Sequence, residues 1–251
     1  MLDRLISLMQ GATVPTVLIL ALITVTAVAL RPQRKSLPTQ QKFDESQYPI
    51  VDESDSETAS VDPKERSNRQ VKAQRFRMQM PVTSDPGVGV AAAIHHWAPD
   101  FPALPISEST AIIVGDAIDA KANLSEDKQS VYSDFKFKTV AVLKDACGVA
   151  KENSLITASR YGGRVRFPNG HTQLIFMSGL GMPRIGQRYV LFLKQTNADF
   201  DLLTAYALSA GKVFPLDSGT PNFSVYENVD ESDFLKTIQE SIGSPLKLTC
   251  N

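Results

Sequence analysis

The sequence predicts a mainly β protein, in which a small barrel or sandwich of short strands with one C-terminal helix follows an N-terminal transmembrane helix and a disordered tether. An uncharged apolar run fills residues 14–30, a polar stretch follows it, and short alternating segments separated by turn residues begin near residue 99. These three observations divide the 251 residues into an anchor (1–31), a tether (32–98) and a globular domain (99–251).

The anchor is predicted from the run Val14–Leu30, which approaches the roughly 20 residues that cross a hydrocarbon core. A core helix of a soluble domain would carry polar residues on one face, and this run has none of the required pattern. A cleaved secretory signal is the other alternative, because Ala27-Val28-Ala29 can serve as a cleavage site, but the apolar core is longer than usual for a signal. We therefore expect an uncleaved single-pass anchor in the lipid bilayer.

The predicted tether, residues 32–98, is rich in Gln, Ser, Pro and charge and poor in aliphatic periodicity. Such a segment cannot bury enough apolar surface to offset the entropy lost on ordering, so we expect it to be disordered. Its basic part, Arg66–Met80, has a second interpretation as an amphipathic helix on anionic lipid, with Phe76, Met78 and Met80 as apolar contacts. A solvated linker is the plainer interpretation.

Strands are predicted from Pro99 onward. Residues 131–143 alternate between apolar and charged positions, which is typical of a half-buried strand. The Asn169-Gly170 step between two short runs predicts a tight hairpin. The predicted strands are Thr110–Ala117, Val131–Leu143, Ser154–Ser159, Arg164–Phe167, Thr172–Met177, Gln187–Lys194, Phe200–Ala207 and Gly211–Leu216.

One helix is predicted after the strands. Asp230 or Ser232 can cap its start, apolar residues recur at helical spacing from Phe234 to Ile242, and Gly243 with the following proline ends it. A stripe of this kind usually packs on a sheet. We expect the helix to cover one face of the β-domain.

The composition and the motifs predict no catalytic residue and no cofactor. A formal net charge of −1 removes the electrostatic argument for a nucleic-acid partner, although arginines and tyrosines in the strand region contain the ingredients of a single-strand site. The sequence contains no Gly-x-Ser-x-Gly elbow, Walker loop or dinucleotide fingerprint. We expect no nucleic acid among the partners.

The histidines provide the alternative function. His95 and His96, with Asp100 close behind, form the only cluster of ligand-type residues, but adjacent side chains point apart on a strand, so we predict no metal site. His171 lies in the predicted hairpin turn, where we expect it to be exposed. The alternative is an envelope hydrolase or a metal-dependent enzyme that uses His95, His96 or His171.

The two cysteines, Cys147 and Cys250, lack metal-ligand spacing and fit either a reducing or an oxidising compartment. In an exported domain, a disulfide between them would pin the C-terminal tail. In the chain-entropy picture, closing a loop of roughly 100 residues contributes up to about 4.7 kcal/mol. Two free thiols are the alternative.

Two blocks of the globular domain, GGRVRFPNG (162–170) and PRIGQRYVLFL (183–193), carry a resemblance. With the flanking sequence from Leu104 to Leu216, a little under half of the chain, they resemble an uncharacterised family of bacterial secreted or membrane-tethered proteins. The resemblance implies a compact OB-like β-barrel and an extracytoplasmic location. It assigns no catalytic residue and no ligand.

The side of the membrane is predicted from two conflicting signals. Arg31, Arg34 and Lys35 follow the apolar run directly, and counting these charges places the domain in the cytoplasm. The family resemblance implies the opposite side, and we follow it. We therefore expect a membrane-tethered, extracytoplasmic binding or assembly module that presents its domain to an unknown envelope protein or ligand.

Overall fold

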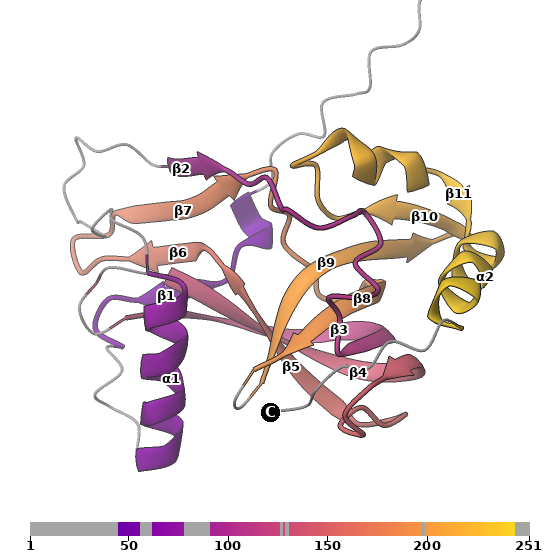
Figure 1. Ribbon diagram of the computed structural model, residues 1–251. Helices are drawn as coiled ribbons and strands as arrows, with labels where there is room; N and C mark the ends of the chain where they lie inside the picture. The colour runs from indigo at the N-terminus through magenta and orange to yellow at the C-terminus, as the bar shows by residue number, and fades with distance from the viewer. Residues whose placement is uncertain are drawn as a thin grey trace, which may run out of the picture. The chain divides into compact units, whose positions relative to one another are not determined.

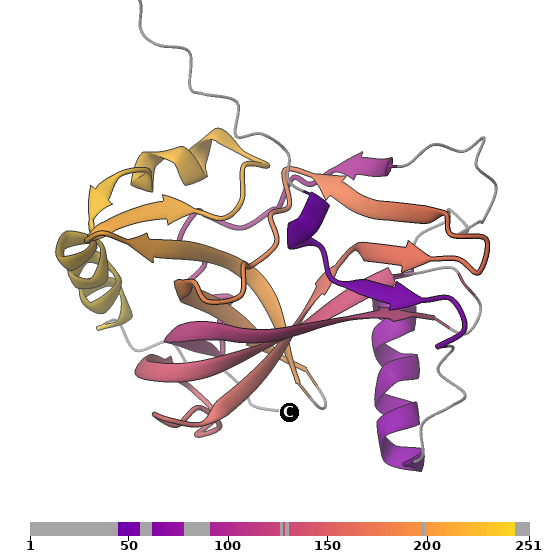
Figure 2. The ribbon, with the colours of Figure 1, turned by 180° about the vertical axis from the view of Figure 1, so that it is seen from behind.

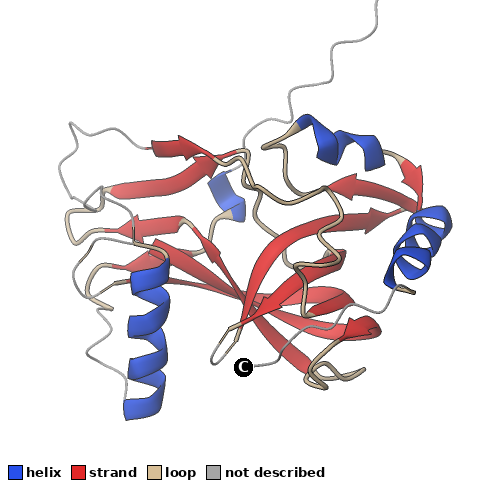
Figure 3. Ribbon diagram, viewed as in Figure 1, coloured by secondary structure: helices blue, strands red, loops and turns tan. Residues whose placement is uncertain are grey.

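The structure is a computed structural model that describes residues 45–55, 62–77, 91–125, 128, 131–196 and 199–243. The predicted anchor at 14–30 and Cys250 lie outside these residues. Among the described helices, none combines the length and the apolar character that a membrane crossing requires. The described part is mainly β and carries a helix near its C-terminal end, as predicted (Figure 1; Figure 3).

Five strands pair edge to edge in a closed ring. β3 (Ala111–Leu124) pairs antiparallel with β4 (Val131–Asp145), and β4 pairs antiparallel with β5 (Leu155–Tyr161). β9 (Phe200–Ser209) pairs parallel with β5 and antiparallel with β8 (Arg188–Gln195), which in turn pairs with β3. The order around this five-strand ring is therefore β3-β4-β5-β9-β8.

One buried apolar cluster draws on every strand of the five-strand ring. Its members include Ile113, Phe135, Ala158, Leu191 and Ala205, one from each strand, and none of these is exposed. Removing such side chains from water contributes about 25 cal/mol for each Å² of apolar surface. The ring is therefore built around a shared core, and part of its other side, including Ile112, Phe192 and Tyr206, is buried in a second apolar cluster.

A second sheet of four strands lies beside the ring, with the order β1-β6-β7-β2. β6 (Gly163–Arg166) and β7 (Thr172–Ser178) form the predicted hairpin. β1 (Ile50–Asp52) adds in parallel to β6, and β2 (Ala91–His96) adds in parallel to β7. Both outer strands therefore come from residues N-terminal to the predicted globular domain.

The predicted tether is wrong for the described part of residues 32–98. This part contains a 3-10 helix, η1 (Glu45–Gln47), the strands β1 and β2, and the helix α1 (Pro63–Arg75). All of them belong to one compact unit, residues 43–251. The strands gain their backbone hydrogen bonds from β6 and β7, more than 70 residues away for β2, so local apolar periodicity does not reveal them.

The C-terminal helix forms as predicted. α2 (Glu231–Ile242) follows Asp230 and ends at Gly243, and its Phe234 and Ile238 are fully buried in an apolar cluster with strand residues such as Tyr206. Asp230 makes no capping hydrogen bond from its side chain. Figure 2 shows α2 beside β10 (Lys212–Pro215) and β11 (Val229–Asp230), with the 3-10 helix η4 (Pro221–Tyr226) close by.

Candidate binding face beneath helix α1

Acidic and polar side chains form a row across three neighbouring strands of the five-strand ring. Asp134 of β4 pairs in register with Ser159 of β5, and Ser159 pairs in register with Asp201 of β9. Residues directly opposite on neighbouring strands point to the same side of a sheet. Asp199, in the turn before β9, adds a third carboxylate that shares a lysine partner with Asp134. We call these four residues the acidic face.

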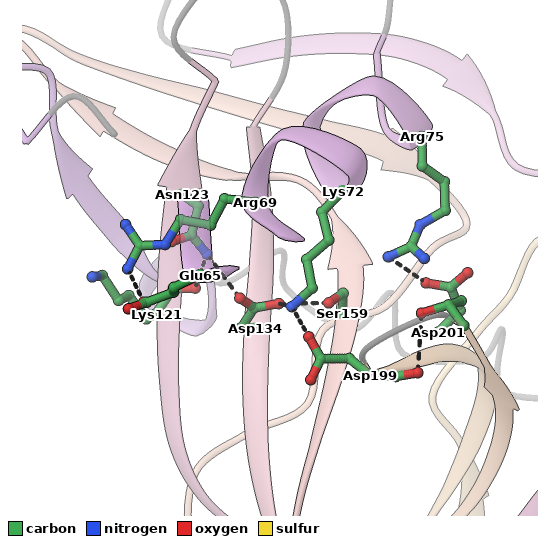
Figure 4. Close-up of polar contacts among 11 residues, drawn as sticks. Glu65, Arg69, Lys72, Arg75, Lys121, Asn123, Asp134, Ser159, Asp199 and Asp201 are labelled. Carbon is green, nitrogen blue, oxygen red and sulfur yellow. Dashed lines mark hydrogen bonds and ion pairs between the residues drawn. The ribbon is translucent and has the colours of Figure 1, made fainter. Parts of the chain in front are cut away.

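Helix α1 lies across the acidic face and places two cations on it (Figure 4). Lys72 Nζ donates to Asp134 Oδ1 at 3.1 Å and also pairs with Asp199 Oδ2. Arg75 Nη2 lies 2.9 Å from Asp201 Oδ1. All three carboxylates of the face therefore contact α1.

The Asp134 carboxylate is oriented by hydrogen bonds from neutral side chains on the neighbouring strands, independently of Lys72. Ser159 Oγ donates to Asp134 Oδ1 at 2.5 Å, and Asn123 Nδ2 donates to Asp134 Oδ2 at 3.2 Å. Both carboxylate oxygens thus have neutral donors on neighbouring strands. A carboxylate fixed in this way binds a cation without losing further side-chain freedom, and hydrogen bonds to ionised groups are the stronger kind.

Aromatic stacking adds an apolar contact at the C-terminal end of α1. The aromatic rings of Phe76 and Tyr132 stack, with centroids 5.6 Å apart and planes 22° apart, and the Arg75 guanidinium lies 4.8 Å from the Phe76 centroid. Met78 and Met80 lie outside the described residues. The side chains of Phe76, Lys72 and Arg75 contact the β-domain, so in this structure they are not available to bind a lipid surface.

The attachment of α1 depends on charge more than on apolar burial. Among the helix side chains that the structure describes, Lys72 and Ala73 alone are buried, and Phe76 just beyond the helix is half-buried. The partly exposed pair of Arg75 with Asp201 contributes about 0–1 kcal/mol, and an aromatic pair contributes about 0.5–1.5 kcal/mol. The buried Lys72 must be desolvated to reach its two carboxylates, so its Coulombic gain is partly offset. A helix of this length is marginal by itself in water. We therefore expect α1 to leave the acidic face more readily than the strands of the ring separate from one another.

The Asp201 carboxyl reports on this contact. Burial raises the pKa of Asp201, while the charges of Arg75, Lys194 and Lys72 lower it and the charge of Asp199 raises it. Arg75 has the largest of the lowering effects. Its removal leaves the effect of burial less opposed.

We expect Arg75→Ala to raise the pKa of Asp201 further above the ordinary value for aspartate. Titration of the side-chain carboxyl carbons by NMR measures this directly. The matched control is Lys212→Ala, which removes an exposed cation paired with Asp230 and should leave the pKa of Asp201 unchanged. An unchanged or lower pKa in Arg75→Ala would show that Arg75 does not rest on the face in solution.

Outside the acidic face, Asp217 is buried in the interior together with Arg160. Arg160 Nη2 donates to both carboxylate oxygens of Asp217, at 2.6 and 2.7 Å, and the two side chains are 2% and 0% exposed. Asp217 also accepts hydrogen bonds from Thr204 Oγ1 and from the Gly181 N–H, both at 2.8 Å. The Trp97 ring lies 5.8 Å from the guanidinium carbon. This arrangement ties chain segments together and leaves no room for a substrate at the carboxylate.

The aromatic residues that could stack nucleic-acid bases are enclosed as well. Base stacking requires an accessible ring face. The four residues that the sequence offers beside its arginines are all buried, and so is Arg160. The four are Tyr132, Tyr161, Phe167 and Tyr189. These residues provide no stacking platform.

The structure separates the histidines. His96 pairs in register with Ser178 at the end of β7, and its Nε2 lies 2.8 Å from the Gly219 carbonyl oxygen. His171 immediately precedes the first residue of β7, so about 20 Å of extended chain lies between the two. His95 lies in β2, but its side chain is outside the described part. Within the described residues, no group of three or more His, Cys, Asp or Glu side chains is placed to hold a metal ion.

His171 is half-buried, whereas the turn position predicted an exposed side chain. Its imidazole stacks on Phe167, with centroids 5.9 Å apart and planes 16° apart. The hairpin brings the residues before and after the turn together, and the apolar ring covers the imidazole. In this structure, His171 therefore contributes to the packing of the hairpin.

Cys147 lies in the turn after β4. The Asp145 carboxylate organises this turn by accepting hydrogen bonds from the N–H groups of Cys147 and Val149 at 3.2 Å and of Ala150 at 2.9 Å. Cys250 lies outside the described residues. The disulfide between Cys147 and Cys250 therefore stays a prediction.

The acidic face has no compact signature in the sequence. Lys72 is 62 positions from Asp134, and the four residues of the face come from three separate segments, with Asp199 and Asp201 in the same one. The one available signal is the basic run 64–77, whose charge requires partners elsewhere. Comparison of the chain with protein-family models and with curated proteins finds no match.

Proposed function

We propose that this chain is a membrane-tethered, extracytoplasmic binding or assembly module with no identifiable catalytic site. The seating of α1 on the acidic face is the observation that carries the proposal, because it identifies a surface of the β-domain that holds a charged helix. The apolar run Val14–Leu30 supplies the expected attachment to the bilayer.

We infer further that the five-strand ring is an OB-like barrel. Its five strands include one parallel pair, β5 with β9, and the other neighbours are antiparallel. Five-stranded OB barrels bind ligands on their second and third strands, together with the loops between strands 1 and 2 and between strands 4 and 5. The corresponding elements here are β4, β5 and the β8–β9 turn, which carry Asp134, Ser159 and Asp199. The location of the acidic face supports a binding role by analogy of fold.

The enzymatic alternative is less well supported by the geometry. His96 and His171 lie at opposite ends of β7, so they cannot act on one substrate atom, and the base of a catalytic site must reach its proton within hydrogen-bonding distance. His96 is engaged with the Gly219 carbonyl, and His171 packs on Phe167.

Capture from solubilised membranes tests the binding proposal. The variant Asp199→Lys/Asp201→Lys reverses the charge of the acidic face, and Asp116→Lys/Asp119→Lys reverses two carboxylates on β3 that pair with Arg188 and Lys136 outside the face. We expect the face variant to lose proteins that the wild-type chain and the β3 variant both retain. Identical sets of captured proteins from all three chains would contradict a role for the face in binding.

A reporter fused after Asn251 tests the location. If the domain is extracytoplasmic, we expect a periplasmic alkaline phosphatase fusion to be active and a cytoplasmic β-galactosidase fusion to be inactive. Substituting Arg31, Arg34 and Lys35 together with glutamine is the matched variant, because these charges favour the opposite topology. The reverse activities in the wild-type fusions would place the domain in the cytoplasm.

A further inference from the structure

We infer that the acidic face is a receptor for a basic helix of a partner protein, and that α1 is an internal competitor for it. The inference rests on the proposed binding function and specifies the class of partner. In the structure, the face already holds a helix of the required chemistry, and this helix belongs to the chain itself.

The contacts of α1 define what the partner helix must carry. Lys72 and Arg75 are three positions apart and therefore lie on one side of the helix, where they meet Asp134 and Asp201. Phe76 follows directly and stacks on Tyr132. The expected ligand is a helix with a lysine or arginine, a second basic residue three positions later, and an aromatic residue immediately after it.

Charge complementarity favours a cationic ligand over an anionic one. The face presents three carboxylates, α1 supplies two cations to it, and Lys194 of β8 lies in register with Asp201 at its edge. Potentials of opposite sign raise the rate at which partners meet and exclude partners of like charge. An acidic segment or a phosphate-rich ligand would meet three carboxylates here.

The test uses a labelled synthetic peptide of residues 62–77 as the probe and the full chain in detergent as the receptor. In the variant Lys72→Glu/Arg75→Glu, the chain's own helix cannot compete, so the apparent affinity for the peptide should increase at least about tenfold over the wild-type chain. The control variant is Lys212→Glu/Lys236→Glu, which makes the same change in charge at exposed sites on β10 and α2. We expect this control to bind as weakly as the wild type. A peptide that carries both glutamates should bind to none of the three chains.

Fluorescence of Trp97 and the thermal midpoint establish that each variant is folded. If the double variant does not fold, Phe76→Ala weakens the contact of α1 by removing the stacking on Tyr132, and this variant should bind the peptide more tightly than the wild type.

Three results would overturn the inference. One is equal peptide binding by the folded wild-type chain and by the folded variants with a weakened α1. Another is no binding at millimolar peptide. A wild-type dimer that Lys72→Glu/Arg75→Glu abolishes would also overturn it, because the occupant would then be a second copy. If the peptide binds as expected but the face variant captures the same proteins as the wild-type chain, the proposed function is contradicted and the inference about α1 is not.

Discussion

Replacing Asp217 with alanine is expected to lower the free energy of unfolding by about 3–5 kcal/mol, because it leaves a buried charge without its partner. Arg160 is 2% exposed, and its Nε and Nη1 have no hydrogen-bond partner within the described residues. The substitution also removes the acceptor of Thr204 and Gly181. Chemical unfolding followed by the fluorescence of Trp97, the single tryptophan of the chain, measures the change.

Two companion variants separate the buried pair from general effects of charge. Asp116→Asn breaks the exposed pair with Arg188 and should lower the unfolding free energy by no more than about 1 kcal/mol. Arg160→Met/Asp217→Asn removes both charges and keeps an acceptor for Gly181, so it should be more stable than Asp217→Ala. A loss below 1 kcal/mol in Asp217→Ala would show that the pair is hydrated in solution.

Gly181→Ala is expected to destabilise the same region by about 1–3 kcal/mol, in the range found for overpacked sites. A Cβ at this position would lie 2.0 Å from the Leu216 carbonyl oxygen, so the backbone must move, and the Gly181 N–H is a donor to Asp217. Urea unfolding measures the loss.

Gly243→Ala serves as the control for Gly181→Ala. The new Cβ would meet its nearest neighbour, the Glu240 carbonyl oxygen, at 3.4 Å, and Gly243 has right-handed helical angles at the end of α2. The free energy of unfolding of Gly243→Ala should therefore differ little from that of the wild type. Equal effects of the two substitutions would contradict the close approach of Gly181 to Leu216.

The elements that depend on local chemistry could be predicted from the sequence. The hairpin follows from Asn169-Gly170, although only Gly170 has a positive φ, of 83°, so a single left-handed residue closes the loop. α2 follows from its apolar stripe and from Gly243. β3 continues to Leu124, beyond the predicted end at Ala117, because it pairs along its full length with β4.

The elements that depend on distant partners could not be predicted. β1 is three residues long and exists because it adds to β6, which lies more than 100 positions later. α1 has almost no apolar face, so its periodicity resembles that of a solvated linker, and ion pairs to the β-domain hold it. Tyr132, in a strand with clear alternation, is buried because Phe76 covers it.

The candidate site could not be predicted for the same reason. Asp134, Ser159 and Asp201 become neighbours only through the registers of β4, β5 and β9. Histidine is a residue type typical of catalytic sites, but the second sheet places His96 of β2 beside one end of β7 and His171 just before the other end. Residue type alone therefore favours the histidines as candidates, whereas the strand registers assemble the acidic face.

Native-state hydrogen exchange tests most directly whether the acidic face is a surface that α1 can leave. We predict that the amides of α1 open with a lower free energy than those of β4 and β8. Raising the salt concentration to about 0.5 M should lower the opening free energy of α1 further, because salt screens the partly exposed ion pair of Arg75 with Asp201. Opening free energies for α1 that equal those of β4 and β8 and do not respond to salt would contradict the account, because α1 would then be a fixed part of the domain.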